Sequence, residues 1–138
     1  MTPENTQPEI KVGVLACSGE ECLGGTVSRL ATRRVVGVLR PNKAVTLCLP
    51  LYVAGGEEEQ NFAKDHPVIA VEGCSKCCAS KATEKFSGKV RGMVSVEEII
   101  GKDAALSKTV SGRELMAEHM DMVKLVARAI CEKTDAIV

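Results

Sequence analysis

Cysteine is the residue type in this sequence with the clearest capacity for chemistry. The chain of 138 residues contains seven cysteines, and a cysteine thiolate is both a metal ligand and a nucleophile. Cys17 and Cys48 end two separate apolar stretches, whereas Cys74, Cys77 and Cys78 share the short segment CSKCC. An odd number of cysteines disfavours a complete set of disulfides. The pattern therefore predicts metal binding or thiol chemistry.

The elements that position these cysteines alternate between strands and helices. Short apolar runs predict strands over residues 11–17, 44–49, 67–71 and 89–96. Helical patterns are expected over residues 27–39, 75–86 and 111–133, with a further helix after Gly55; Ser111 and Glu114 are expected to form a capping box. We therefore predict an α/β fold with a small, open, mainly parallel sheet of about four strands, covered by helices in a three-layer Rossmann or flavodoxin-like arrangement.

In this fold Cys17, Cys48 and Cys74 each lie at or near the carboxyl end of a predicted strand. Because the carboxyl ends of parallel strands meet at one edge of a sheet, we expect the three thiols to lie close together. Cys78 is expected in the first turn of the next helix, and Cys77 and Cys22 are alternative contributors. Four thiolates match the tetrahedral preference of zinc, and the sequence predicts a zinc site whose role is structural, sensory or the binding of a small ligand. An iron–sulfur cluster is an alternative.

Other interpretations of the same residues remain open. Cys74 and Cys77 form a C-x-x-C pair at a strand-to-helix junction, which suggests thiol redox exchange or persulfide transfer. Cys17 and Cys48 can also be small buried apolar residues, and this is the expected role of Cys131 on the last helix. No residue pattern indicates a particular reaction. The Gly24-Gly25-Thr26 segment is interpreted as the flexible start of a helix rather than an anion-binding loop.

Composition limits the range of partners. The 18 basic and 18 acidic residues are interspersed, so no basic surface for nucleic acid or membranes is expected. The polar segment of residues 1–9 is unlike a signal peptide and predicts a flexible tail, with one domain over residues 10–138 and a cytoplasmic location. The methionines of the last helix, Met116, Met120 and Met122, suit core packing or an unknown protein partner.

Three short segments carry a family resemblance. The segments ACSG at residues 16–19, LCLP at 47–50 and EGCSKCCA at 72–79 resemble the DGC-domain zinc-binding proteins. The resemblance runs from about Val12 to Phe86 and implies that the chelating cysteines are Cys17, Cys48, Cys74 and Cys78. This chain differs from the family pattern in having Glu72 in place of the aspartate of the Asp-Gly-Cys motif, and in its additional Cys22 and Cys77.

Overall fold

The computed structural model describes residues 11–137, so the predicted tail of residues 1–9 lies outside the described residues. Four strands form one sheet in the order β2-β1-β3-β4, and every neighbouring pair is parallel. The strands are β1 (Val12–Ala16), β2 (Ala44–Val45), β3 (Val68–Glu72) and β4 (Gly92–Ser95). The predicted α/β fold with an open parallel sheet is therefore confirmed.

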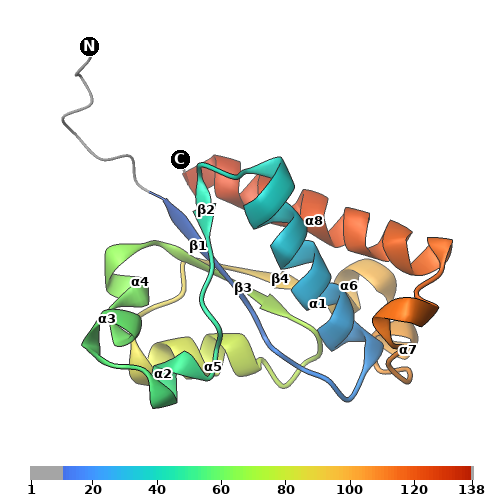
Figure 1. Cartoon of the computed structure of the whole chain (residues 1–138), viewed down its shortest axis with the longest axis horizontal. Coiled ribbons are helices and arrows are strands. Elements are labelled where there is room, and N and C mark those ends of the chain that lie inside the picture. Colours follow the sequence, from blue (N-terminus) through green and yellow to red (C-terminus); the bar gives the residue numbers. More distant parts are fainter. Residues whose placement is uncertain (1–10, 138) are drawn as a thin grey trace, which may run out of the picture.

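Helices cover both faces of this sheet, as Figure 1 shows. One face carries α1 (Leu23–Arg34), α6 (Val96–Ile100), α7 (Lys102–Ala105) and α8 (Ala117–Ile137). The other face carries α2 (Leu51–Ala54), α3 (Glu57–Gln60), α4 (Phe62–Asp65) and α5 (Cys78–Phe86). A π-helical turn at Val35–Leu39 extends α1, and a short 3-10 helix spans Gly112–Glu114.

The alternation of side chains along β1 and β3 creates these two layers. Val12 and Val14 pack with α1 and α8, whereas Leu15 points to the opposite layer beside Tyr52. All five residues of β3 are buried, as expected for a parallel strand covered on both faces. The two central strands are therefore the rigid base of the loops that follow them.

The second strand is shorter than predicted. Only Ala44 and Val45 pair with β1, opposite Val12 and Gly13, and the chain then leaves the sheet instead of continuing as a strand to Leu49. Because β2 is an edge strand, no further strand pairs with its outer side, and its early end disrupts no other strand. Cys48 consequently lies three residues beyond the end of β2 rather than at it.

Several helix boundaries also differ from the prediction. The last helix begins at Ala117 rather than Ser111, whose side chain makes no capping hydrogen bond, and Leu115 is extended. His119 accepts a hydrogen bond at Nδ1 from the backbone N–H of Met116 (2.9 Å). The short helices α2, α6 and α7 were not predicted.

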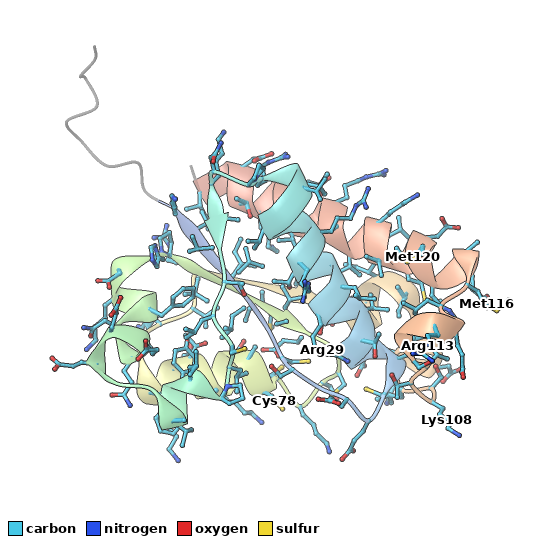
Figure 2. The ribbon with its side chains drawn as sticks, in the orientation of Figure 1. Arg29, Cys78, Lys108, Arg113, Met116 and Met120 are labelled. Atoms are coloured by element: carbon cyan, nitrogen blue, oxygen red, sulfur yellow. The ribbon has the colours of Figure 1, made fainter. Side chains whose placement is uncertain are left out.

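The surface of the described helices has two further properties. None of them combines the length and apolar character required to cross a lipid bilayer. At the start of α8, Met116 and Met120 are exposed, as Figure 2 shows, whereas Met122 packs against the core. A protein partner for this helix stays a prediction.

Candidate functional site

The loops that follow β1 and β3 are joined at the carboxyl end of the sheet. The backbone N–H of Cys17 donates to the carbonyl oxygen of Val71 (3.1 Å), which extends the pairing of the two strands by one residue. The backbone N–H of Gly73 then donates to the sulfur of Cys17 (3.4 Å). In Figure 1 the two loops run beside each other at this end of the molecule. The predicted proximity of Cys17 to the segment that contains Cys74 is therefore present.

Glycines allow the backbones of these loops to approach so closely. A Cβ atom on Gly24 would lie 2.1 Å from the carbonyl oxygen of Gly73, and one on Gly25 would lie 2.1 Å from that of Gly19. No side chain fits at either position, because real Cβ atoms do not approach backbone oxygens at that distance. The start of α1 is thus tightly packed rather than flexible, and this role of Gly24 and Gly25 was missed in the sequence. The adjacent pair of glycines was the available signal.

Four of the predicted cysteines line one small cavity of about 50 Å³ at this junction. They are Cys17, Cys22, Cys74 and Cys78. The rest of the lining comes from Glu72 and the glycines that precede or face the thiols. A cavity of this size has room for one small ion, since a water molecule in the liquid occupies about 30 Å³.

The thiol of Cys17 is held by its neighbours. Its sulfur lies 3.4 Å from Oγ of Ser28, whose hydroxyl donates to the carbonyl oxygen of Gly25 (2.7 Å). A serine hydroxyl has one proton, so the protonated thiol of Cys17 is the donor in this chain of hydrogen bonds. Ser28 is fully buried on α1, and the sequence had not indicated a role for it.

Glu72 is a buried carboxylate at the end of β3, with 1% of its surface exposed. Its two oxygens accept hydrogen bonds from the backbone N–H groups of Ala79 (3.0 Å) and Ser80 (2.7 Å) in the first turn of α5. These are amides that the helix itself leaves without partners, and the positive end of the helix dipole stabilises the negative charge. Glu72 therefore fixes α5, and with it Cys78, against the end of β3.

Cys78 is exposed, and its surroundings favour the protonated thiol over the thiolate. Partial burial raises the pKa of Cys78, and the charges of Cys17, Cys74 and Glu72 raise it further, while Lys76 lowers it. Negative charge on Cys17 or Cys74 thus disfavours ionisation of Cys78. A bound cation would reverse this effect, because it would stabilise all three negative charges together.

Cys77 faces a different part of the surface. It has a left-handed backbone conformation (φ 57°) directly before α5, and it lines a groove with Ser80, Met93 and residues between them rather than the thiol cavity. Burial and then the charge of Glu72 raise the pKa of its thiol. The left-handed turn therefore separates Cys77 from Cys74, although the two are only three residues apart.

Cys48 also lies outside the thiol cavity. It is exposed and lines a separate cavity beside α1, together with Ser18 and Arg29. Figure 2 marks Arg29 on α1 and Cys78 at the first turn of α5. Cys48 is displaced because the chain leaves the sheet after Val45. The described structure thus unites Cys17, Cys74 and Cys78 but does not place Cys48 with them.

Cys131 and His66 do not line the thiol cavity. Cys131 is buried in the core beside α1, as predicted. His66 packs against the ring of Phe62, with the ring centroids 5.2 Å apart. Within residues 11–137 no group of three or more histidine, cysteine, aspartate or glutamate side chains is already arranged to hold a metal ion. The thiols in the cavity are therefore neighbours without a formed coordination geometry.

Comparison with known proteins agrees with the resemblance seen in the three cysteine segments. The model of the DGC domain matches residues 13–127, which include the sheet except for Val12, the thiol cavity and the first half of α8. No curated protein and no solved structure matches the chain. With a match over most of its length, the chain belongs to the DGC domain family.

Proposed function

We propose that the protein binds a single zinc ion at the thiol cavity, with Cys17, Cys74 and Cys78 as ligands. The observation that carries this proposal is the convergence of these thiols from two strand ends and one helix start on a cavity with room for one ion. Thiolates are ligands that zinc prefers, and the α5 helix start favours negative charge. Rotation of the cysteine side chains about χ1 would bring the sulfurs toward one point.

The fourth ligand distinguishes two forms of the proposal. Cys48 is the residue that the family pattern implies. Its use requires a movement of residues 46–50, in which Leu47 and Leu49 are half-buried against the core beside Tyr52. Cys22 already lines the cavity. Four thiolates would make a closed structural or sensory site, whereas three would leave a position for a small ligand.

The structure supports this metal site better than a dithiol mechanism. Cys74 and Cys77 line different cavities, and the pKa of Cys77 is raised rather than lowered, which reduces the fraction of reactive thiolate. A redox C-x-x-C pair needs the opposite arrangement, with two adjacent sulfurs and one stabilised thiolate.

The test is to purify the protein without oxygen and to measure zinc, iron and acid-labile sulfide per chain. We expect about one zinc, no sulfide, and loss of the metal in Cys17→Ser, Cys74→Ser and Cys78→Ser. Cys77→Ser is the matched control, because it lies in the same loop but faces elsewhere, and it should retain zinc. Comparison of Cys22→Ser with Cys48→Ser identifies the fourth ligand.

Two results would contradict the proposal. Protein that contains no zinc and fails to bind added zinc in the micromolar range would exclude the site. Loss of zinc in Cys77→Ser with retention in Cys78→Ser would show that the CSKCC segment presents its other face to the metal. Iron with an equal amount of sulfide would instead identify a cluster.

A further inference from the structure

A second and larger cavity lies beside the thiol cavity, on the other side of the loop that follows β1. Its volume is about 380 Å³, and it lies between α1 and the segment that leaves the sheet after β2. Its lining includes Ser18, Arg29, Thr32, Arg33, Leu47 and Cys48. It shares no residue with the thiol cavity. The following inference is therefore independent of the form of the zinc site in which Cys22 is the fourth ligand, whereas recruitment of Cys48 to zinc would alter this lining.

Two buried polar atoms in the lining have no hydrogen-bond partner among the described residues. They are Nε of Arg29 and Oγ1 of Thr32, and Thr32 as a whole is only 3% exposed. A buried hydroxyl in a helix ordinarily donates to a carbonyl one turn earlier, as Thr134 does to Ile130 (2.9 Å). Leaving such a group unpaired destabilises the folded protein. A ligand that accepts hydrogen bonds from both atoms would remove this cost.

The positive charge of Arg29 and Arg33 makes the cavity suitable for an anion. Arg29 and Arg33 are four residues apart on one face of α1, and no aspartate or glutamate belongs to the lining. No salt bridge among the described residues involves either arginine. Arg29 does donate from Nη2 to Oγ1 of Thr26 (3.2 Å), which holds its guanidinium in place. A positioned guanidinium is well suited to carboxylate and phosphate oxygens.

The apolar part of the lining indicates that the anion has an organic body. Leu30, Leu47 and Ala16 provide carbon surface next to the two arginines. A volume of about 380 Å³ is at the lower end of the range of small-molecule sites. We propose that this cavity binds a small organic anion, whose carboxylate or phosphate accepts hydrogen bonds from Arg29 Nε and Thr32 Oγ1 while its apolar portion contacts Leu30 and Leu47.

Calorimetric titration with three probes tests this assignment: inorganic phosphate, butyl phosphate and butyrate, each at constant ionic strength. We expect butyl phosphate or butyrate to bind at least about tenfold more tightly than inorganic phosphate, because its alkyl chain buries apolar surface. Whether butyl phosphate or butyrate binds better distinguishes a phosphate from a carboxylate head. Amide NMR shifts should locate the binding at Ser18, Arg29 and Cys48.

Two substitutions in the lining and one control separate a binding role from a structural one. Arg29→Gln should weaken the preferred probe by about tenfold or more, and Thr32→Val by about threefold to tenfold, as expected for the loss of hydrogen bonds to a charged group. In the ligand-free protein, Thr32→Val should unfold at the same or a higher temperature, because it removes an unpaired buried hydroxyl. Arg34→Gln, on the same helix but outside the lining, should bind normally.

The proposal fails if neither butyl phosphate nor butyrate binds at 10 mM. It also fails if Arg34→Gln weakens binding as much as Arg29→Gln, because the effect would then be a general one of net charge. A Thr32→Val variant that is less stable than the original protein and binds the probes equally well would show that Thr32 is only a packing residue.

Discussion

The sulfur of Cys17 accepts a hydrogen bond from the backbone N–H of Gly73 across 3.4 Å, although the two residues are 56 positions apart in the chain. This contact joins the loop after β1 to the loop after β3. It depends on the absence of side chains at Gly24 and Gly73, whose backbones are in direct contact. The position of the thiols is therefore controlled by backbone packing as much as by the cysteines themselves.

Replacement of Gly24 by alanine should strongly destabilise the protein. The new Cβ would meet the carbonyl oxygen of Gly73 at 2.1 Å, and a backbone group cannot move away as a flexible side chain can. We expect the free energy of unfolding to fall by about 3 kcal/mol, as for severe overpacking, when it is measured by urea titration.

Gly37→Ala is the control for this change. Gly37 lies in the π-helical turn after α1, where an added Cβ meets nothing within 4 Å. Its replacement should leave stability unchanged or raise it by up to about 1 kcal/mol, because alanine reduces the entropy of the unfolded chain. Equal losses in both variants would show that contact between Gly24 and Gly73 is not the cause.

Glu72→Ala should destabilise the start of α5. The change leaves the N–H groups of Ala79 and Ser80 without their carboxylate acceptor in a buried place. We expect a loss of about 3 kcal/mol in the free energy of unfolding, and a smaller loss for Glu72→Gln, which keeps one acceptor oxygen. Glu84→Gln, an exposed change on the same helix, should cost less than about 0.5 kcal/mol. Equal stability of Glu72→Ala and Glu84→Gln would contradict the capping role.

The charge of Glu72 should also control thiol reactivity in the metal-free protein. Burial and this charge raise the pKa of Cys77, and both effects also act on Cys78. Glu72→Gln removes the charge and should lower both values, so that more thiolate is present at pH 8. Alkylation by iodoacetamide, followed by peptide mass spectrometry, should be roughly twofold faster or more at these two residues.

Cys131 serves as the internal reference in that experiment. The pKa of its thiol is raised by burial and by Asp135 and is lowered by Arg40, with no contribution from Glu72. Its alkylation rate should therefore be the same in both proteins. A parallel acceleration at Cys131 would indicate that Glu72→Gln has loosened the whole fold instead.

Stability should decline in alkaline solution because of Cys131. Burial holds its pKa in the folded protein above the ordinary thiol value of 9.0. The folded state thus retains the proton at a pH where the unfolded state has released it, and the free energy of unfolding falls as the pH rises from 9 through the folded pKa. Well below pH 9 the thiol is protonated in both states, so it does not contribute to the pH dependence of the free energy of unfolding.

Thermal unfolding of metal-free protein between pH 8 and pH 10.5 measures this effect. Cys131→Ala removes the titrating group and should show a shallower decline than the original chain, although its absolute stability is lower because of the lost sulfur. Identical slopes would mean that other groups, such as lysines, account for the alkaline loss.

The local sequence contained enough information for the class of fold and for part of the site. The valine-rich runs of β1 and β3 are buried on both faces, and such runs are typical of central parallel strands. Because both strands end directly before a cysteine or a Gly-Cys pair, the proximity of Cys17 and Cys74 follows from sheet topology alone. The burial of Cys131 follows equally from the apolar spacing of α8.

Other features depended on interactions that are distant in sequence. Strand β2 ends after Val45, and Cys48 therefore lines another cavity. The end of this edge strand depends on its pairing with β1, for which the local sequence gives no signal. The left-handed conformation of Cys77 also has no local signal in the sequence. It accompanies the contact between Glu72 and the first turn of α5, and this contact is visible only in the tertiary structure.

The sequence by itself thus determined the α/β class, the parallel sheet and the gathering of cysteines at its carboxyl edge, because hydrophobic periodicity and strand ends are local properties. Only the tertiary structure decided which thiols share a cavity, that Gly24 and Gly25 are packing residues, and that Arg29 and Thr32 are left with unpaired buried atoms. Those outcomes depend on contacts between α1 and the loops after the strands. The residues in contact are far apart in the chain, so local sequence patterns do not predict them.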